Sequence, residues 1–377
     1  MARIQEFYRG RRKRRNVAFL PFLILLLVFS VLLVLFYGMQ KYAVISKDGV
    51  SVELPLLGGT GGVSAVDDTG HVVKEFETVS VPLNFGEADY SHIRTRAGEN
   101  VSPVRAIFVP AENVNPDKII EYSARLVAGN ALMLEMKPRS GVTLWETHTQ
   151  MAQAYSLTMM SETSKALPDM IASLKEKDIY LVAQISCCID ELLPTRSTAY
   201  CIHTEGGLNY RDGLGTWLDP YNLDLRSWVA EMVRELWDLG FDEVVLRDVA
   251  HPSLAEAVPL LYTREISTPR STSAAVCGLA AGVADLLYDR GDKVLSIYCN
   301  SREALVRDDL TTGQNAVLFM KFYDRIYLDT DKYSYPFNVE DIQSNVLTGN
   351  VYDRLVPVVI NYIPDNTSWI LVDGPED

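Results

Sequence analysis

The chain has 377 residues and a formal net charge of −14. This length allows one large domain with attachments, because α/β barrels commonly take ~250 residues as a single domain. Residues 1–16 contain seven Lys/Arg and one Glu, so the remainder of the chain carries −20. That acidic excess disfavours nucleic acid as a partner.

An uncharged apolar run of 23 residues, Val17–Met39, directly follows the basic cluster 11–15. Its length is close to the ~20 residues with which a helix crosses a bilayer. We expect a single membrane-spanning helix with a cytoplasmic N-terminus, because basic residues stay inside, and with the bulk of the chain outside the cell. The alternative, a cleaved signal peptide, would have an apolar region of only ~7–15 residues and a small-x-small cleavage site, which does not follow Tyr37.

The predicted organisation has four parts. A basic cytoplasmic tail (1–16) and the membrane helix (17–39) precede a stalk with short strands (40–102), and a barrel domain follows (103–377). Glycines 58, 59, 61 and 62 favour flexible spacing in the stalk, since no Gly-Lys-Ser/Thr follows them. The stretch 79–84 is a candidate extra strand against the barrel.

Apolar strand-like runs alternate with helical patterns from Val104 onward, which is typical of a parallel sheet with crossover helices. Eight strands are predicted: 104–109, 131–136, 179–185, 244–249, 294–298, 317–322 or its continuation to 328, 356–362 and 369–372. The clearest helices are predicted at 117–127, 164–177, 225–239 and 272–289. The number of strands favours an α/β fold of the (β/α)8 TIM type over an open doubly wound sheet.

One αβ unit is especially clear between Trp217 and Pro252. Asp219 before Pro220 is the expected helix cap, Gly240 suits the helix stop, and a buried strand follows from Val244. The segments WLDPYN and LGFDE resemble the bacterial putative glycoside hydrolase domain family, as do NALMLEMKPRSG at 130–141 and DDLTTGQ at 308–314. The resemblance implies a TIM barrel and action on, or binding of, carbohydrate.

The chain departs from that family at the end of this strand. The family has an aspartate followed by Tyr-Val-Arg-Phe-Pro, whereas this chain has Arg247 in direct register and Asp248 one position later. Because side chains alternate between the two faces of a strand, a slip of one residue would move the acid to the other face. A second departure lies at 326–331, where Tyr327 and Asp329 are the chemical remnants of the family motif.

The active centre of such a barrel lies at the C-terminal ends of the strands, and glycoside hydrolysis requires two carboxyl groups there. Glu135 and Asp248 are the predicted catalytic pair. Structural alternatives remain open: Glu135 can pair with Lys137 or Arg247, and Asp248 can pair with Arg247 or cap a turn. The predicted substrate-binding residues are Arg247, Trp217, Tyr221, Lys137, Tyr298, Gln314, Tyr327 and Asp329.

No metal or other cofactor is expected, because the five histidines form no HExxH motif and the five cysteines form no CxxC pair. Two functions fit these patterns. The first is a membrane-anchored, outward-facing glycoside hydrolase, with envelope polysaccharide as its substrate. The alternative is a catalytically inactive barrel that binds a glycan or a protein at the cell surface. An enzyme should present two carboxylates across one pocket, whereas a binding module should neutralise its acids.

Overall fold

The computed structural model describes residues 43–46, 49–52, 101–126, 130–253, 260–262, 272–299, 311–329, 354–361, 363 and 367–373. The chain divides into two compact units, Met1–Phe85 and Gly86–Asp377. In the first unit, β1 (Ala43–Ser46) and β2 (Gly49–Val52) form an antiparallel hairpin. The predicted membrane helix, the glycine-rich segment and the candidate strand 79–84 lie outside the described residues. Among the helices of the described residues, none combines the length and the apolar character needed to cross a bilayer.

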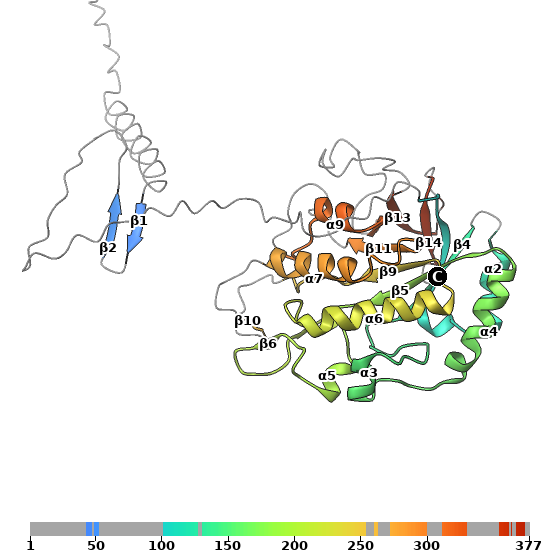
Figure 1. The fold of residues 1–377 in the computed structure, drawn as a ribbon, viewed down its shortest axis with the longest axis horizontal. Coiled ribbons are helices and arrows are strands. Elements are labelled where there is room, and N and C mark those ends of the chain that lie inside the picture. The colour runs from blue at the N-terminus through green and yellow to red at the C-terminus, as the bar shows by residue number, and fades with distance from the viewer. Residues whose placement is uncertain are drawn as a thin grey trace, which may run out of the picture. The chain divides into compact units, whose positions relative to one another are not determined.

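The second unit contains a closed barrel of eight parallel strands, as predicted (Figure 1). In chain order these strands are β3 (Arg105–Val109), β4 (Ala131–Lys137), β5 (Tyr180–Ser186), β9 (Glu243–Arg247), β11 (Val294–Cys299), β12 (Arg325–Asp329), β13 (Leu355–Ile360) and β14 (Trp369–Val372). Each strand pairs with the next one, and pairing of β14 with β3 closes the ring. All carboxyl ends of the strands therefore meet at one end of the barrel.

Side chains from all eight strands fill the barrel, so its interior is a packed core. Inward-facing apolar residues are Ala106, Ala131, Met133, Val182, Val245, Tyr298, Tyr327, Val356, Val358 and Ile370. A larger apolar cluster lies between the outer face of the strands and the helices, and it includes Leu132, Leu134, Ile185 and Leu246. The alternation of these two sets along each strand defines which residues point into the barrel.

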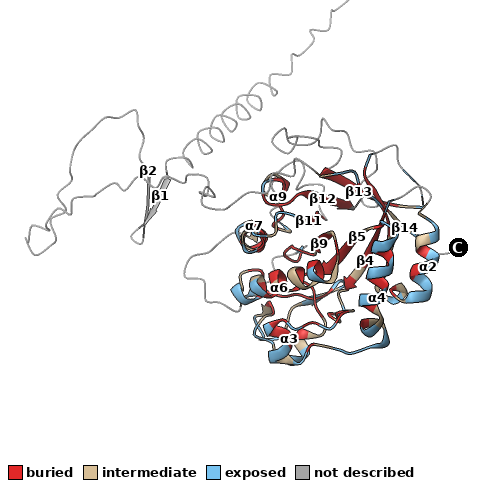
Figure 2. Cartoon of the chain, turned by 45° about the vertical axis from the view of Figure 1, so that its right-hand side comes forward, coloured by how far each residue is buried: buried red, intermediate tan, exposed pale blue. Residues whose placement is uncertain are grey.

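Helices cover the outside of the barrel, with a buried side toward the strands and an exposed side toward solvent (Figure 2). The longer ones are α2 (Pro116–Ala124), α4 (Glu162–Glu176), α6 (Leu223–Leu239) and α7 (Thr272–Leu286). Short α3 (Gln150–Tyr155) and α5 (Leu193–Arg196) lie in the connections after β4 and β5. Gly240 ends α6 at φ 119°, which confirms the predicted helix stop.

The predicted cap of α6 was wrong. Asn222 is the N-cap, and its side-chain oxygen accepts from the backbone N–H groups of Asp224 and Leu225. Asp219 is buried three residues earlier and accepts from the N–H of Tyr221 at 2.8 Å. Both residues are good caps in isolation, so the sequence did not distinguish them.

The predicted strand 317–322 was also wrong, because this segment is helix α9 (Ala316–Phe322). Asn315 caps the helix by accepting from the N–H of Leu318 at 3.0 Å. The barrel strand in this part of the chain is β12, which overlaps the end of the alternative prediction, the run continued to 328. A short apolar run fits a buried helix and a buried strand equally well. Here the side chain of Asn315 binds a backbone N–H group of the first turn, which favours the helix.

Two loops meet beyond the carboxyl ends of β5 and β9. The loop 187–222 carries β6 (His203–Thr204) and the hairpin of β7 (Arg211–Asp212) with β8 (Gly215–Thr216). The loop after β9 carries β10 (Leu260–Leu261), which pairs antiparallel with β6. These contacts hold the two loops together beside the open end of the barrel.

All five cysteines are reduced and buried. Burial raises the pKa of Cys188 and of Cys201 to about 12. Both thiols therefore stay protonated at neutral pH and act as small apolar side chains.

Candidate functional site

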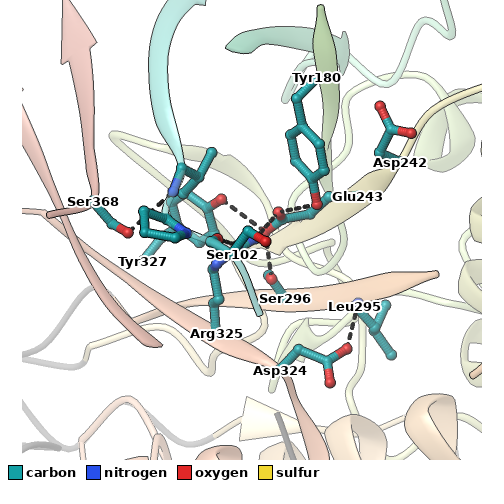
Figure 3. Close-up of polar contacts among 12 residues, drawn as sticks. Ser102, Tyr180, Asp242, Glu243, Leu295, Ser296, Asp324, Arg325, Tyr327 and Ser368 are labelled. Atoms are coloured by element: carbon teal, nitrogen blue, oxygen red, sulfur yellow. Dashed lines mark hydrogen bonds and ion pairs between the residues drawn. The ribbon is translucent and has the colours of Figure 1, made fainter. Parts of the chain in front are cut away.

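The N-terminal end of the barrel is closed by a buried ion pair between Glu243 of β9 and Arg325 of β12 (Figure 3). Three hydroxyl groups also donate to the carboxylate: Tyr180 at 3.0 Å, Ser296 at 2.6 Å and Tyr327 at 2.7 Å. Arg325 donates in addition to the carbonyl of Ser102. Every oxygen of Glu243 thus has a partner inside the protein, as stability requires of a buried charge.

Tyr327, a predicted substrate-binding residue, belongs to this closed end. Its side chain is fully buried, and burial followed by the charge of Glu243 raises the pKa of its hydroxyl well above the usual value. Its hydroxyl is bound to Glu243, so Tyr327 is placed to close the barrel rather than to meet a ligand at the open end. Asp329 is the last residue of β12 and pairs in register with Val358.

Glu135 lies on the inner face of β4 toward its carboxyl end. Its carboxylate accepts from the backbone N–H of Ala111, in the turn after β3, at 3.2 Å. The side chain is half-buried. Among the described residues, no lysine or arginine forms an ion pair with it, although its charge contributes to the raised pKa of Arg139. Near the carboxyl end of β4, Glu135 is therefore an acceptor with a single backbone donor from the described residues.

The expected pairing of Glu135 with Lys137 was wrong. The register of β4 against β5 shifts between these two residues, so Glu135 faces Gln184 and Lys137 faces Ile185. This bulge turns Lys137 to the outer face of the barrel. There its ammonium group lies 2.7 Å from Asp190 and 5.2 Å from the ring centre of Trp228, and it donates to the carbonyl of Ser186.

Asp190 is the counter-ion of Lys137, and the sequence did not indicate that its side chain is buried. One of its oxygens accepts from the N–H groups of Leu192 and Leu193 at 2.8 and 2.7 Å. Gly141 packs against it so closely that a Cβ there would lie 2.2 Å from the carboxylate. Lys137 and Asp190 are both almost completely buried and stabilise the loop after β5.

Asp248, the second predicted catalytic acid, follows β9 in a left-handed backbone conformation with φ 57°. Arg139 binds both of its oxygens, with Nε at 3.0 Å and Nη2 at 2.7 Å. The hydroxyl of Ser186 donates to it at 2.8 Å. The carboxylate is fully buried, and the alternative pairing with Arg247 is replaced by this bidentate bond to Arg139.

The protonation state of Asp248 follows from these contacts. Burial raises its pKa, but the hydrogen bonds from Arg139, the charges of Arg247 and Arg139, and the hydroxyl of Ser186 together bring it below its usual value. A general acid in glycoside hydrolysis needs the opposite shift. Asp248 is therefore ionised at neutral pH, and its buried carboxylate is bound by Arg139 and Ser186.

Arg247 is the last inward-facing residue of β9 and is half-buried. Its guanidinium carbon lies 5.4 Å from the ring centre of Tyr298 on β11. One long hydrogen bond of 3.4 Å joins it to the amide oxygen of Gln184. Its Nε atom is buried without a hydrogen-bond partner.

The remaining predicted residues hold loops. The amide nitrogen of Gln314 donates to the carbonyls of Val249 and Tyr298 at 3.1 and 3.3 Å, which connects the ends of β9 and β11. Trp217 is buried, and its Nε1 has no hydrogen-bond partner. The ring of Tyr221 packs edge-on against Tyr262 at 4.9 Å.

Within the loop after β9, a hydrogen bond joins His251 Nε2 and the hydroxyl of Tyr262 at 2.8 Å. Burial lowers the pKa of His251 and raises that of Tyr262 to about 12. Neither group was predicted as part of the site. Together with Tyr221, they fix the loop after β9 against the loop after β5.

A family model described as "Putative glycosyl hydrolase domain" matches residues 106–327, which is more than half of the chain. The chain belongs to this family. The match includes the strands that carry Glu135 and Arg247, and also Asp248 directly after β9.

Solved structures similar to this member of the glycosyl hydrolase domain family have low sequence identity to it. A hypothetical protein from Ruminiclostridium thermocellum is 18% identical with a TM-score of 0.42, and the match covers 51% of this chain and 96% of that one. A GH31 sulfoquinovosidase from E. rectale is 12% identical (TM-score 0.40; 62% and 33% covered). A GH36 alpha-galactosidase from Geobacillus stearothermophilus is 9% identical (TM-score 0.47; 74% and 40% covered). This family member thus spans less than half the length of the two enzymes.

The comparison with curated proteins found no match to this family member. Arg139 and Ser186, which hold Asp248, are the residues of the site that the sequence did not indicate. Arg139 lies in the stretch at 130–141 that resembles the family, and this location was the one signal available for it.

Proposed function

We propose that the barrel is a carbohydrate-binding domain of the glycosyl hydrolase domain family that does not hydrolyse its ligand through the Glu135–Asp248 pair. The supporting observation is the bidentate bond from Arg139 to the buried carboxylate of Asp248, to which Ser186 adds a third hydrogen bond. Hydrolysis needs one protonated acid and one accessible nucleophile or base. A buried, ionised and bidentate-bound carboxylate fits neither role.

The open end nevertheless keeps groups that suit a sugar. Glu135 is a half-buried acceptor, and Arg247 is a donor with unused N–H groups. Carboxylates and guanidinium groups at a half-buried site exchange hydrogen bonds well with hydroxyl groups. The proposed ligand is an envelope polysaccharide, with the domain displayed outside the cell on the helix at Val17–Met39.

A hydrolase remains the second candidate because Glu135 lies at the carboxyl end of β4 with a single backbone donor from the described residues. In that case the partner acid is a residue other than Asp248. Asp329, at the carboxyl end of β12, has a suitable position in the chain.

The test uses the purified full-length protein with a panel of envelope and plant oligosaccharides, and measures both binding and the release of reducing ends. We expect binding without turnover. Glu135→Gln should weaken binding, whereas Glu121→Gln on the exposed face of α2 is the matched control and should not. Turnover by the wild type that is lost in both Glu135→Gln and Asp248→Asn would refute the proposal and establish the predicted catalytic pair.

A further inference from the structure

The open end of the barrel contains two arginines with very different surroundings. Arg139 places Nε and Nη2 on the carboxylate of Asp248, so its charge is matched by an acid. Arg247 has no such partner: among the described residues, no carboxylate lies within ion-pair distance of it. A guanidinium has five N–H donors, and Arg247 uses one of them in a long bond to Gln184.

Two neighbours hold Arg247 in this position. Tyr298 offers its ring at 5.4 Å from the guanidinium carbon, and Gln184 binds Nη1 from the adjacent strand β5. Packing on an aromatic ring leaves the edge of the planar guanidinium, which carries the N–H groups, available to a ligand. The strand fixes the backbone, so the side chain is placed before a ligand arrives.

Arg247 is also the inward-facing residue at the carboxyl end of β9. On the same face of this strand, Glu243 lies at the closed end and Val245 in the middle of the barrel. The position at which a barrel of this type receives its ligand therefore carries a guanidinium with no ion-pair partner among the described residues. A half-buried guanidinium without a counter-ion is costly unless something binds it.

We propose that Arg247 binds an anionic oxygen group of the ligand, a carboxylate, sulfate or phosphate, and that the barrel therefore recognises acidic rather than neutral carbohydrate. This inference rests on the proposed carbohydrate-binding function and specifies its ligand class. The guanidinium matches such groups through two parallel N–H···O bonds, which are stronger than bonds between neutral groups.

The net charge of the whole chain does not by itself favour an acidic ligand. With a formal net charge of −14, the protein as a whole repels an anion. The paired Arg139 offers no compensation, because Asp248 neutralises it. Selectivity for acidic sugars must then come from a local group, and it should disappear when that group is removed.

The experiment measures affinities of the full-length protein for size-matched oligosaccharides in pairs that differ only in the anionic group. Uronate oligomers are compared with their methyl esters, and sulfated and phosphorylated oligomers with the unsubstituted sugars. We expect the acidic member of at least one pair to bind roughly tenfold to a hundredfold more tightly. The three types of pair distinguish the source of the anionic oxygen.

Variants assign the preference to Arg247. Arg247→Met should abolish the preference, so that the acidic and the neutral member of a pair bind equally, while Arg247→Lys should retain part of it, because the charge stays but the planar fork is lost. Arg125→Met removes an exposed arginine paired with Asp373 and should change nothing. Thermal unfolding of each variant verifies that it is folded.

The outcomes separate this inference from the function on which it rests. Equal affinity for acidic and neutral members, or a preference that survives Arg247→Met, overturns the inference and leaves carbohydrate binding intact. Binding of no oligosaccharide in the panel overturns both. A preference lost only in Arg247→Met and reduced in Arg247→Lys supports both.

Discussion

The two ends of the barrel use the same residue types for different purposes. At the N-terminal end, Glu243 and Arg325 face each other and three hydroxyl groups complete the network. At the C-terminal end, Arg139 matches Asp248, but Glu135 and Arg247 have no ionic partner among the described residues. Matched charges indicate a stabilising role, and charges without an ionic partner at the carboxyl ends of the strands are candidates for contact with a ligand.

Backbone irregularities produce this difference. The register shift between Glu135 and Lys137 sends the lysine out of the barrel, away from the glutamate. The positive φ of Asp248 lets its carboxylate meet Arg139 and Ser186 rather than continue the alternation of β9. β9, in contrast, has no register shift from Glu243 to Arg247. Glu243 at the closed end and Arg247 at the carboxyl end therefore lie on the same inner face of the strand.

The largest effect is expected from Glu243→Gln at the closed end. The substitution leaves Arg325 buried without a counter-ion, which should lower the free energy of unfolding by about 3–5 kcal/mol. Chemical denaturation measures this loss. Glu121→Gln, in an exposed pair with Lys118, is the control and should cost less than about 0.5 kcal/mol.

A second variant tests whether charge is the cause. Replacing both partners, as in Glu243→Gln with Arg325→Met, should recover part of the stability, since no unpaired charge then remains. Carbohydrate affinity should not change in either variant that folds, because both residues lie at the closed end. A loss of affinity in a fully folded Glu243→Gln protein would contradict the division between the two ends.

Asp248→Asn should have an intermediate effect on stability. Arg139 is 30% exposed and keeps contact with water, so the loss should be about 2 kcal/mol, below that for a fully buried pair. Asp373→Asn, which breaks a bidentate but exposed bond to Arg125, is the matched control and should cost less than about 1 kcal/mol.

The contribution of Asp248 to the free energy of unfolding should decrease at low pH. Its folded-state pKa lies below the usual 3.8, so the stabilisation is fully present above about pH 4 and is lost as the pH falls through the folded-state pKa. Denaturation curves from pH 6 to pH 2 should therefore fall less steeply for Asp248→Asn than for the wild type. Parallel curves for the two proteins would show that Arg139 does not stabilise the ionised form.

The smallest effect on stability is expected from Arg247→Met. Its contacts are one long hydrogen bond and the ring of Tyr298, so the free energy of unfolding should change by less than about 1 kcal/mol. Arg139→Met is the comparison, because it should destabilise the protein about as much as Asp248→Asn does. If Arg247→Met were instead the more damaging of the two, Arg247 would be a structural residue.

Much of the fold could be predicted because parallel strands buried on both faces appear as continuous apolar runs. The run at 369–372 coincides with β14, β4 is one residue longer than predicted, and β5 is shifted by one residue at both ends. A short run such as 317–322 is compatible in length and composition with a helix and with a strand. The segment forms a helix whose first turn is capped by the side chain of Asn315, which accepts from the N–H of Leu318.

The candidate site was predicted less completely. Its place at the carboxyl ends of the strands followed from the barrel, and Glu135, Asp248 and Arg247 do lie there. The partners of Asp248 did not follow, because the sequence indicated neither Arg139 nor Ser186. The ion pair of the site joins residues that are distant in sequence, because Arg139 and Asp248 are 109 positions apart.

By itself, the sequence of this protein determined which segments are buried, and thereby the eight-stranded barrel, because periodicity and capping act over a few residues. Only the tertiary structure decided which charges are matched. A bulge of one residue in β4 and a single positive φ after β9 reorient Lys137 and Asp248, and closure of the barrel brings Arg139 to the latter. The charge left on Arg247 is a consequence of those three-dimensional pairings, which no local pattern encodes.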